Sequence, residues 1–277
     1  MKKDLNDDSS LNLTSGLPPI ARAHAEALRN LVREASERNA ASSFVIEGPH
    51  LIERAFQSAP ELVKEVIFTE EAYTSNPSIA LQAGQKKIPC YHISAKLSER
   101  ISDTKTPQGI FALVSIPRRS TIDDSRSTIT IALDDVQDPG NVGTIIRTAA
   151  WFGVSQILLS KECADPYSSK VLRATQGEIF STIVGNRGDV VDSLRILQKK
   201  GHQIIAATVD PSACLLYKMA FHENVVLVFG SEAHGVSREV LDLADGQIII
   251  PKFGQGESLN VATSVGIILS EVMRKKQ

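Results

Sequence analysis

The sequence predicts an α/β protein with two domains, the second of which has a parallel sheet covered by helices on both faces. In residues 128–277, short and nearly continuous apolar runs alternate with helical segments, which is the pattern of buried parallel strands. Residues 19–116 hold a separate, smaller set of strands and helices, and the polar segment 117–127 lies between the two sets. The chain has 277 residues, which is enough for two domains of ordinary size.

The N-terminal domain is expected to follow a polar, turn-rich tail at residues 1–18. It opens with an amphipathic helix in which Leu28, Leu31 and Val32 recur at helical spacing, and this helix is expected to end at the polar stretch 37–43. Strands are then predicted at residues 44–48, 63–69, 88–94 and 109–116, and helices at 51–57, 79–85 and 95–101. These elements form a small α/β layer of their own.

The C-terminal domain is expected to begin after a linker. Residues 117–127 combine proline, serine and mixed charge without periodicity, which is typical of a domain linker. Six strands are predicted at residues 128–134, 156–160, 181–185, 203–209, 225–230 and 247–251. The last helix carries one apolar stripe from Val261 to Val272, and its basic end, with Arg274 and Lys275, suits the negative end of the helix dipole.

Composition excludes several classes of protein. The formal net charge of -2 and the pI of about 6.3 neither require nor exclude a polyanionic partner. Cys90, Cys163 and Cys214 are isolated, which predicts reduced thiols in the cytoplasm and no zinc site. No apolar run approaches the roughly 18 residues of a membrane span, and no signal peptide pattern opens the chain. We therefore expect no membrane partner and no metal.

Three junctions that follow predicted strands carry glycine, asparagine and serine, and together they predict a ligand site. The loops at residues 230–235 and 254–260 offer main-chain N–H and C=O groups at close range, which suits an adenosine-like ligand. The chain has no dinucleotide-binding fingerprint, P-loop or nucleophile elbow. His234 is interpreted as a non-catalytic loop residue.

The first junction, DDVQDPGN, predicts a tight exit from the strand at 128–134. Gly140 tolerates a positive φ, and the helix is expected to start near Asn141. Arg147 is expected to extend over Gly143, where the missing side chain leaves room, toward the mouth of the loop. In the alternative interpretation Arg147 only pairs with a nearby carboxylate, that of Asp134, Asp135 or Asp138.

The other two junctions also leave alternatives open. Glu232 is a candidate contact to ligand or substrate, or else a carboxylate that favours a helix N-terminus. Ser258 is either a site residue or the N-cap of the last helix, with Asn260 in the first turn of that helix.

At these junctions the chain resembles the SpoU/TrmH family of RNA 2'-O-ribose methyltransferases, within the knotted SPOUT class. The family's first motif, Asn-x-Gly-x-x-x-Arg-Thr, matches residues 141–148, and the second, Gly-Ser/Ala-Glu-x-x-Gly, matches 230–235. The third, Ile-Pro followed by a glycine-containing loop and Ser-Leu-Asn-Val, matches 250–261. The motifs occur in the family's order and extend from about Asp134 to the end of the chain. The N-terminal block looks like the small substrate-binding domain of many members.

The resemblance implies a C-terminal domain with a deep trefoil knot, in which S-adenosyl-L-methionine binds. It also implies homodimers with the site near the interface, so that the apolar stripe of the last helix partly faces a second subunit. No metal takes part. The residues expected to hold the cofactor are Gly230, Ser231, Gly235, Ile250 and Leu259.

The implied reaction transfers a methyl group to a ribose 2'-hydroxyl, with Arg147 as the favoured catalytic group. Because an arginine stays protonated, we expect it to orient a phosphate and to stabilise a developing alkoxide. The expected helpers are Asn141, Ser258 and Asn260, which orient the hydroxyl and Arg147, and Glu232, which holds Arg147 or the substrate.

By analogy with family members, the separate N-terminal domain makes ribosomal RNA, of the 23S type, the expected substrate. The alternatives are a tRNA methyltransferase and a catalytically silent, knotted RNA-binding protein, although the intact motif residues count against the silent protein. Arg173, beside Lys170, is a candidate RNA contact or else a solvated helix charge.

Overall fold

The computed structural model describes residues 16–117, 129–154, 156–185 and 187–276. The chain divides into two compact units, Met1–Ser115 and Ile116–Gln277, and each is described by itself. Most of the predicted tail and all of the predicted linker except Pro117 lie outside the described residues. Among the residues that are described, no helix combines the length and the apolar character that crossing a membrane requires.

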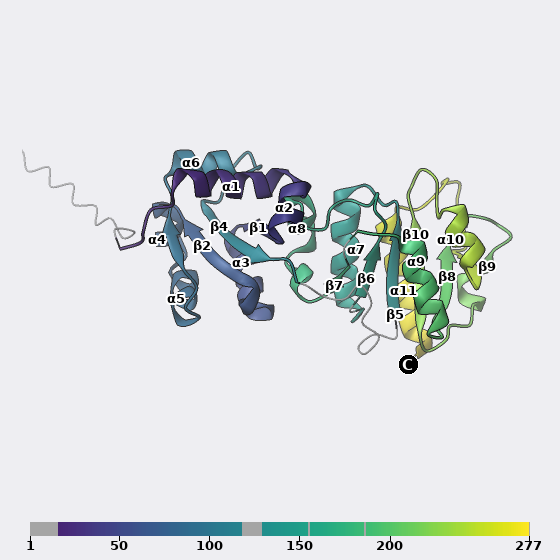
Figure 1. Ribbon diagram of the computed structural model, residues 1–277. Coiled ribbons are helices and arrows are strands. Elements are labelled where there is room, and N and C mark those ends of the chain that lie inside the picture. The colour runs from purple at the N-terminus through teal and green to yellow at the C-terminus, as the bar shows by residue number, and fades with distance from the viewer. Residues whose placement is uncertain (1–15, 118–128, 155, 186, 277) are drawn as a thin grey trace, which may run out of the picture. The chain divides into compact units, whose positions relative to one another are not determined.

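The N-terminal unit is built on a four-stranded sheet in the order β1-β4-β2-β3 (Figure 1). Its strands are β1 (Ser43–Glu47), β2 (Val63–Phe68), β3 (Cys90–His92) and β4 (Ile110–Ser115). β4 pairs antiparallel with both β1 and β2, whereas β2 and β3 are parallel. The chain before the first helix extends the edge of the sheet, because the main chain of His92 bonds to Pro18 and Ile20. All four predicted strands are present.

Helices cover both faces of this sheet. α1 (Arg22–Arg33) and α6 (Ala95–Ile101) pack on one face, where Leu28 and Ile101 meet Phe111 in a shared apolar core. Alternation along the strands directs Ile46 and Ile110, which are also buried, to the opposite face. The helices on that side are α3 (Pro49–Ser58), α4 (Glu70–Ser75) and α5 (Pro77–Gln85).

The polar stretch 37–43, predicted to end the first helix, instead contributes to a second helix, so that prediction is wrong. α1 breaks at Glu34, whose φ of -112° and ψ of 120° are extended, and α2 (Ala35–Ala41) follows. α2 has no apolar stripe from which it could be predicted. It is fixed by Arg38, whose buried guanidinium donates from Nη1 to the carbonyl oxygens of Leu31 (2.6 Å) and Val32 (3.2 Å) at the end of α1.

Arg38→Ala is expected to lower the free energy of unfolding by about 2–3 kcal/mol, because it leaves buried carbonyls without a charged donor. Urea unfolding followed by circular dichroism measures this change. Arg100→Ala, which removes an exposed guanidinium from α6, is the control and is expected to cost less than about 0.5 kcal/mol. Equal free energies of unfolding for the two variants would show that Arg38 does not stabilise the fold.

The C-terminal unit has a seven-stranded sheet in the order β7-β6-β5-β10-β8-β11-β9, and every adjacent pair is parallel. The predicted parallel sheet is confirmed. Its strands are β5 (Ile129–Asp134), β6 (Gln156–Leu159), β7 (Ile183–Val184), β8 (Gln203–Ala207), β9 (Cys214–Leu215), β10 (Val225–Gly230) and β11 (Gly246–Ile249). β9 was not predicted, because two exposed residues carry no apolar pattern.

Both faces of this sheet are covered, as predicted (Figure 1). α9 (Val190–Lys199) and α10 (Arg238–Leu243) pack over one face, around Ala132 and Val228. On the other side α7 (Pro139–Trp151) packs against α8 (Ser169–Thr175) and α11 (Val261–Lys276). The described residues also include three short 3-10 helices, η1 (Pro60–Leu62), η2 (Glu178–Phe180) and η3 (Leu216–Lys218).

The apolar stripe of α11 is buried within its own unit. Val265, Leu269 and Val272 have no exposed surface, and Val261 and Ala262 are 7% exposed. The expectation that this stripe partly faces a second subunit is therefore wrong. α11 is instead a core helix, which fixes the position of the loop that precedes it.

Candidate active site

The carboxyl ends of β5 and β10 lie side by side. The parallel register places Gly230, the last residue of β10, opposite Asp134, the last residue of β5. The loops that leave these two strands, and the loop between β11 and α11, are the three junctions that the sequence singles out. In an open parallel sheet this edge is the usual place for a ligand.

Side chains from all three junctions are joined by hydrogen bonds. Asn141, in the first turn of α7, donates from Nδ2 to Oε1 of Glu232 in the loop after β10. Asn260, in the loop before α11, donates from Nδ2 to Oδ1 of Asn141 over 2.9 Å. Residues 119 positions apart in sequence thus meet at one point. Three of the five predicted catalytic residues form a continuous network.

Asn141 is positioned by an N-cap. α7 begins at Pro139, two residues before the predicted start, and Oδ1 of Asp138 accepts a hydrogen bond of 2.8 Å from the main-chain N–H of Asn141. Gly140 is already helical and does not use the positive φ that glycine tolerates. Asp135 makes the turn instead, with a φ of 60°. Aspartate tolerates this region better than most residues with a side chain.

Polar groups beneath the first loop hold it in place. The main-chain N–H of Asp135 donates to Oγ of Ser160 over 2.9 Å, and the buried carboxylate of Asp134 accepts from the N–H of Ser237 over 2.8 Å. Cys163 donates from Sγ to the carbonyl oxygen of Leu133. Burial raises the pKa of the Cys163 thiol, which keeps it a neutral donor. The Asp134 contact ties the first loop to the second.

The second loop is a tight turn. Ser231 and Gly235 face each other in an isolated bridge, with the N–H of Gly235 donating to the carbonyl oxygen of Ser231 over 2.9 Å. A Cβ on Gly230 would lie 2.0 Å from the carbonyl carbon of Gly235, so only glycine fits there. Glu232 lies within this turn. Since α10 begins only at Arg238, the alternative that Glu232 favours a helix N-terminus is wrong. His234 contributes a main-chain N–H to Oγ of Ser231, and its side chain is exposed.

The third loop ends in a second N-cap. Oδ1 of Asn260 accepts from the N–H groups of Ala262 (3.0 Å) and Thr263 (3.2 Å), so Asn260 caps α11 and lies outside its first turn. The alternative that Ser258 caps this helix is wrong. Because one amide both caps α11 and bonds to Asn141, the position of the helix sets the position of the network.

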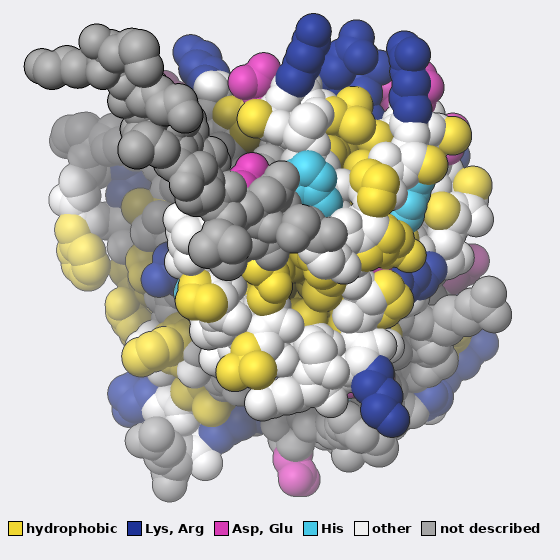
Figure 2. Space-filling model, turned by 90° about the vertical axis from the view of Figure 1, so that its left-hand side faces the viewer, with side chains coloured by type: hydrophobic (Ala, Val, Ile, Leu, Met, Phe, Trp, Pro, Cys, Tyr) yellow, Lys and Arg dark blue, Asp and Glu magenta, His cyan; other side chains and the backbone are white. Residues whose placement is uncertain are grey.

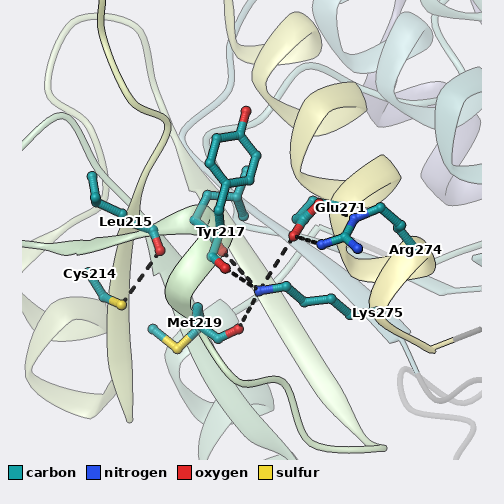
Figure 3. Close-up of polar contacts among 8 residues, drawn as sticks. Cys214, Leu215, Tyr217, Met219, Glu271, Arg274 and Lys275 are labelled. Atoms are coloured by element: carbon teal, nitrogen blue, oxygen red, sulfur yellow. Dashed lines mark hydrogen bonds and ion pairs between the residues drawn. The ribbon is translucent and has the colours of Figure 1, made fainter.

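The far end of α11 is anchored to the edge of the sheet (Figure 3). Nζ of Lys275 donates to the carbonyl oxygens of Tyr217 (2.9 Å) and Met219 (2.8 Å), just after β9. Arg274 donates to both carboxylate oxygens of Glu271, and this lowers the pKa of Glu271. Both ends of α11 are thus fixed by polar contacts.

The loop between β11 and α11 has open main chain and exposed apolar side chains. Among the described residues, no hydrogen bond involves the main chain at positions 251–259. Leu259 is 49% exposed and Phe253 is 94% exposed. A loop that combines open main-chain N–H and C=O groups with an accessible leucine fits a ligand with a flat, hydrogen-bonding ring, such as the adenine of S-adenosylmethionine. No group of His, Cys, Asp or Glu in the described part of the chain could hold a metal ion.

Arg147 and Ser258 lie outside the network. Arg147 is exposed on α7 and makes no ion pair with Asp134, Asp135 or Asp138, so the alternative of a purely structural pair is wrong. The expected role of Gly143 is also wrong. Its missing side chain admits α8 and leaves no room for Arg147, because a Cβ there would lie 2.4 Å from Cβ of Ala174. Ser258 is exposed and has no hydrogen bond within the described residues.

The supporting residues of the site were not predicted. Asp138 had a readable signal, since an aspartate before Pro-Gly is typical of an N-cap followed by proline at the first helical position. Ser160 and Cys163 had no sequence signal, because they are brought to the first loop only by the pairing of β5 with β6. Arg173 lies half-buried on α8, and Lys170 is exposed on the same helix.

Comparisons with known proteins identify the families that the two parts of the chain match. Residues 128–270 match the SpoU rRNA Methylase family, and residues 26–112 match the MRM3-like substrate binding domain. An uncharacterized tRNA/rRNA methyltransferase of Synechocystis is 31% identical over 95% of this chain and 96% of its own length. A Bacillus subtilis 23S rRNA (guanosine(2553)-2'-O)-methyltransferase is 35% identical over 84% of this chain and 89% of its own.

Solved structures show the same fold. A putative RNA methyltransferase of the TrmH family from Porphyromonas gingivalis superposes with a TM-score of 0.79 at 30% identity, over 92% of this chain and 99% of that one. An AdoMet-bound rRNA methyltransferase from Sinorhizobium meliloti gives a TM-score of 0.80 at 26% identity, over 94% and 98%. The chain therefore belongs to the SpoU rRNA methylase family of S-adenosylmethionine-dependent RNA 2'-O-ribose methyltransferases.

Proposed function

We propose that this protein methylates a ribose 2'-hydroxyl of 23S-type ribosomal RNA. The observation that carries the proposal is the hydrogen-bonded network of Asn141, Glu232 and Asn260, which joins the three motifs at one point. The Bacillus subtilis relative, which is named for a 23S rRNA position, supports this choice of RNA over tRNA. An intact network also speaks against a catalytically silent protein.

The second and third loops are proposed to hold the cofactor. Gly230, Ser231 and Gly235 shape a turn whose backbone is close-packed on itself, and Ile250 and Leu259 flank the open main chain of the third loop. When bound, S-adenosylmethionine supplies an electrophilic methyl group on its sulfonium. The protein has to orient the hydroxyl toward that methyl and provide for loss of the hydroxyl proton.

Arg147 is proposed to contact the reacting nucleotide. Its guanidinium keeps its proton, so it orients a phosphate and stabilises the developing alkoxide, and the proton leaves to phosphate or water. Arg147 is exposed and makes no ion pair with a described residue, which leaves it available for this role. Ser258 is also exposed and has no hydrogen bond to the described part of the chain, so it is available to orient the hydroxyl.

Within the network, Glu232 is the group proposed to receive the substrate or Arg147. Asn141 uses both its Nδ2 and its Oδ1 for protein contacts, and Asn260 does the same. Oε2 of Glu232 has no hydrogen bond among the described residues. The two asparagines therefore act by fixing this carboxylate, whose second oxygen can accept from a guanidinium or a ribose hydroxyl.

The knot and the homodimer are part of the proposal. Insertion of β10 between β5 and β8, and of β11 between β8 and β9, supports a C-terminal segment that threads through an earlier loop. Trp151, 85% exposed at the C-terminal end of α7, supports a contact with a second copy of the chain. Light scattering on the purified protein measures its mass in solution, and a monomer at micromolar concentration would overturn the dimer.

Calorimetric titration with S-adenosylmethionine and S-adenosylhomocysteine tests the cofactor site. Both ligands are expected to bind, and Leu259→Trp is expected to weaken binding at least about tenfold, because the larger ring fills the cradle. Ile196→Trp, which enlarges an exposed side chain on α9, is the control and is expected to bind normally. Unchanged binding by the Leu259 variant would exclude the third loop as the cradle.

The RNA substrate is tested separately. Transfer of a labelled methyl group to rRNA from cells that lack the protein is expected to give a product whose 2'-O-methyl group stops primer extension at one 23S position. Methylation of tRNA alone would replace the rRNA assignment, and transfer to neither RNA despite cofactor binding would favour the silent protein.

A further inference from the structure

One side of the N-terminal unit carries a stripe of basic side chains. Arg22, Arg29 and Arg33 recur along α1 at spacings that place them on one face of the helix. α6, which packs beside α1, adds Lys96 and Arg100. Figure 2 shows several Lys and Arg side chains, with a few Asp or Glu among them, along the upper edge, at which α1 and α6 lie in Figure 1. These five residues are called the α1/α6 stripe.

The stripe has no partner among the residues that the structure describes. None of its five side chains forms an ion pair or a hydrogen bond with any residue that the structure describes. Glu26 is four residues after Arg22 and three before Arg29, a spacing at which helix ion pairs form, yet it pairs with neither. Since residues 16–115 contain as many Asp and Glu as Lys and Arg, the stripe is a local excess of positive charge on a neutral unit.

The stripe is presented by a rigid surface. Leu28 and Leu31 of α1 and Ile101 of α6 are buried beneath it, and the guanidinium of Arg38 closes the end of α1. The twelve residues of α1, from Arg22 to Arg33, extend over about 16 Å. That length corresponds to roughly five phosphates of a nucleic-acid strand. Fixed cations at this spacing suit a polyanion better than a compact anion.

We propose that the α1/α6 stripe binds phosphates of the RNA substrate and so holds the RNA on the N-terminal unit. This inference rests on the proposed function. Residues 26–112 match a substrate binding domain, and the inference adds which surface of that domain binds the RNA. α1 and α6 contain no Phe, Tyr or Trp on which a base could stack. The stripe therefore positions the RNA through its backbone and leaves the choice of nucleotide to other residues.

A pair of charge-matched variants tests the stripe. Arg29→Gln/Arg33→Gln removes two of its cations, and Lys86→Gln/Lys87→Gln removes two exposed cations that follow α5, on the other face of the sheet. Binding to a 23S rRNA transcript is measured over a range of salt concentrations. The stripe variant is expected to bind about tenfold more weakly, and its slope of log affinity against log salt is expected to fall by about 1.4 to 1.8.

Kinetics and folding controls separate this role from a structural one. In the stripe variant the KM for RNA is expected to rise, while kcat at saturating RNA, the affinity for S-adenosylmethionine and the thermal midpoint stay unchanged within error. The α5 variant is expected to match the wild type in all of these. The proposal is overturned if the stripe variant keeps wild-type affinity and salt slope, or if both variants lose affinity equally. Binding needs no catalysis, so failure of methyl transfer would count against the proposed function alone.

Discussion

Arg147→Ala is expected to lower turnover by about 10³-fold or more, with S-adenosylmethionine affinity changed by only a few-fold. The physical reason is that the guanidinium is proposed to act on the phosphate and on the developing alkoxide, where charge changes during the reaction. Arg147 lies on α7, whereas the second and third loops are proposed to hold the cofactor. Single-turnover methyl transfer at saturating RNA measures the chemical step, and calorimetry measures cofactor binding.

Two further variants make the Arg147 result specific. Arg147→Lys keeps the positive charge without the planar fork, and is expected to recover only part of the rate. Arg238→Ala removes an exposed guanidinium that pairs with Asp242 on α10, and is expected to leave the rate unchanged. Normal turnover in Arg147→Ala would remove this residue from the catalytic site, whatever its effect on RNA binding.

Gly230→Ala is expected to abolish cofactor binding and to lower the free energy of unfolding by about 1–3 kcal/mol. The new Cβ would lie 2.0 Å from the carbonyl carbon of Gly235 and 2.2 Å from the main-chain nitrogen of Val236. These neighbours are main chain, so no side-chain rotation relieves the overlap, and the turn that carries Glu232 has to open. Calorimetric titration and urea unfolding measure the two effects.

Gly84→Ala is the control for this change, because a Cβ at that helical position of α5 meets nothing within 4 Å. It is expected to keep the stability of the wild type or to raise it slightly. A Gly230→Ala protein that binds S-adenosylmethionine normally would show that the second loop lies away from the cofactor. Since this glycine is packed against its own loop, loss of binding in the variant reports the shape of the turn and not a direct clash with ligand.

Close packing against a distant part of the chain also explains why a sequence prediction about a glycine failed. At Gly230 and at Gly143 the missing side chain serves contact between parts of the protein, with Gly235 and Ala174 respectively. A sequence shows that a glycine is present, but the neighbour that approaches it comes from elsewhere in the chain. The interpretation of Gly143 as room for Arg147 failed on this point.

The N-cap of α11 and the helix α2 were also not predictable from local sequence. Both Ser258 and Asn260 are good N-cap residue types, and local sequence does not separate them. In the structure the N-cap is Asn260, whose Oδ1 accepts a hydrogen bond of 3.0 Å from the N–H of Ala262. α2 was not predicted because its stability depends on Arg38, a single buried cation that donates a hydrogen bond to the main chain of α1.

The sequence by itself determined the order and type of most elements, the parallel sheet of the C-terminal unit and the three junctions of the family. It could do so because apolar periodicity and turn residues are local properties of the chain. Only the tertiary structure decided that Asn141, Glu232 and Asn260 share one network and that Arg147 and Ser258 lie outside it. The two contacts of this network join residues that are 91 and 119 positions apart in the sequence. Such contacts depend on strand order and register, which no local pattern encodes.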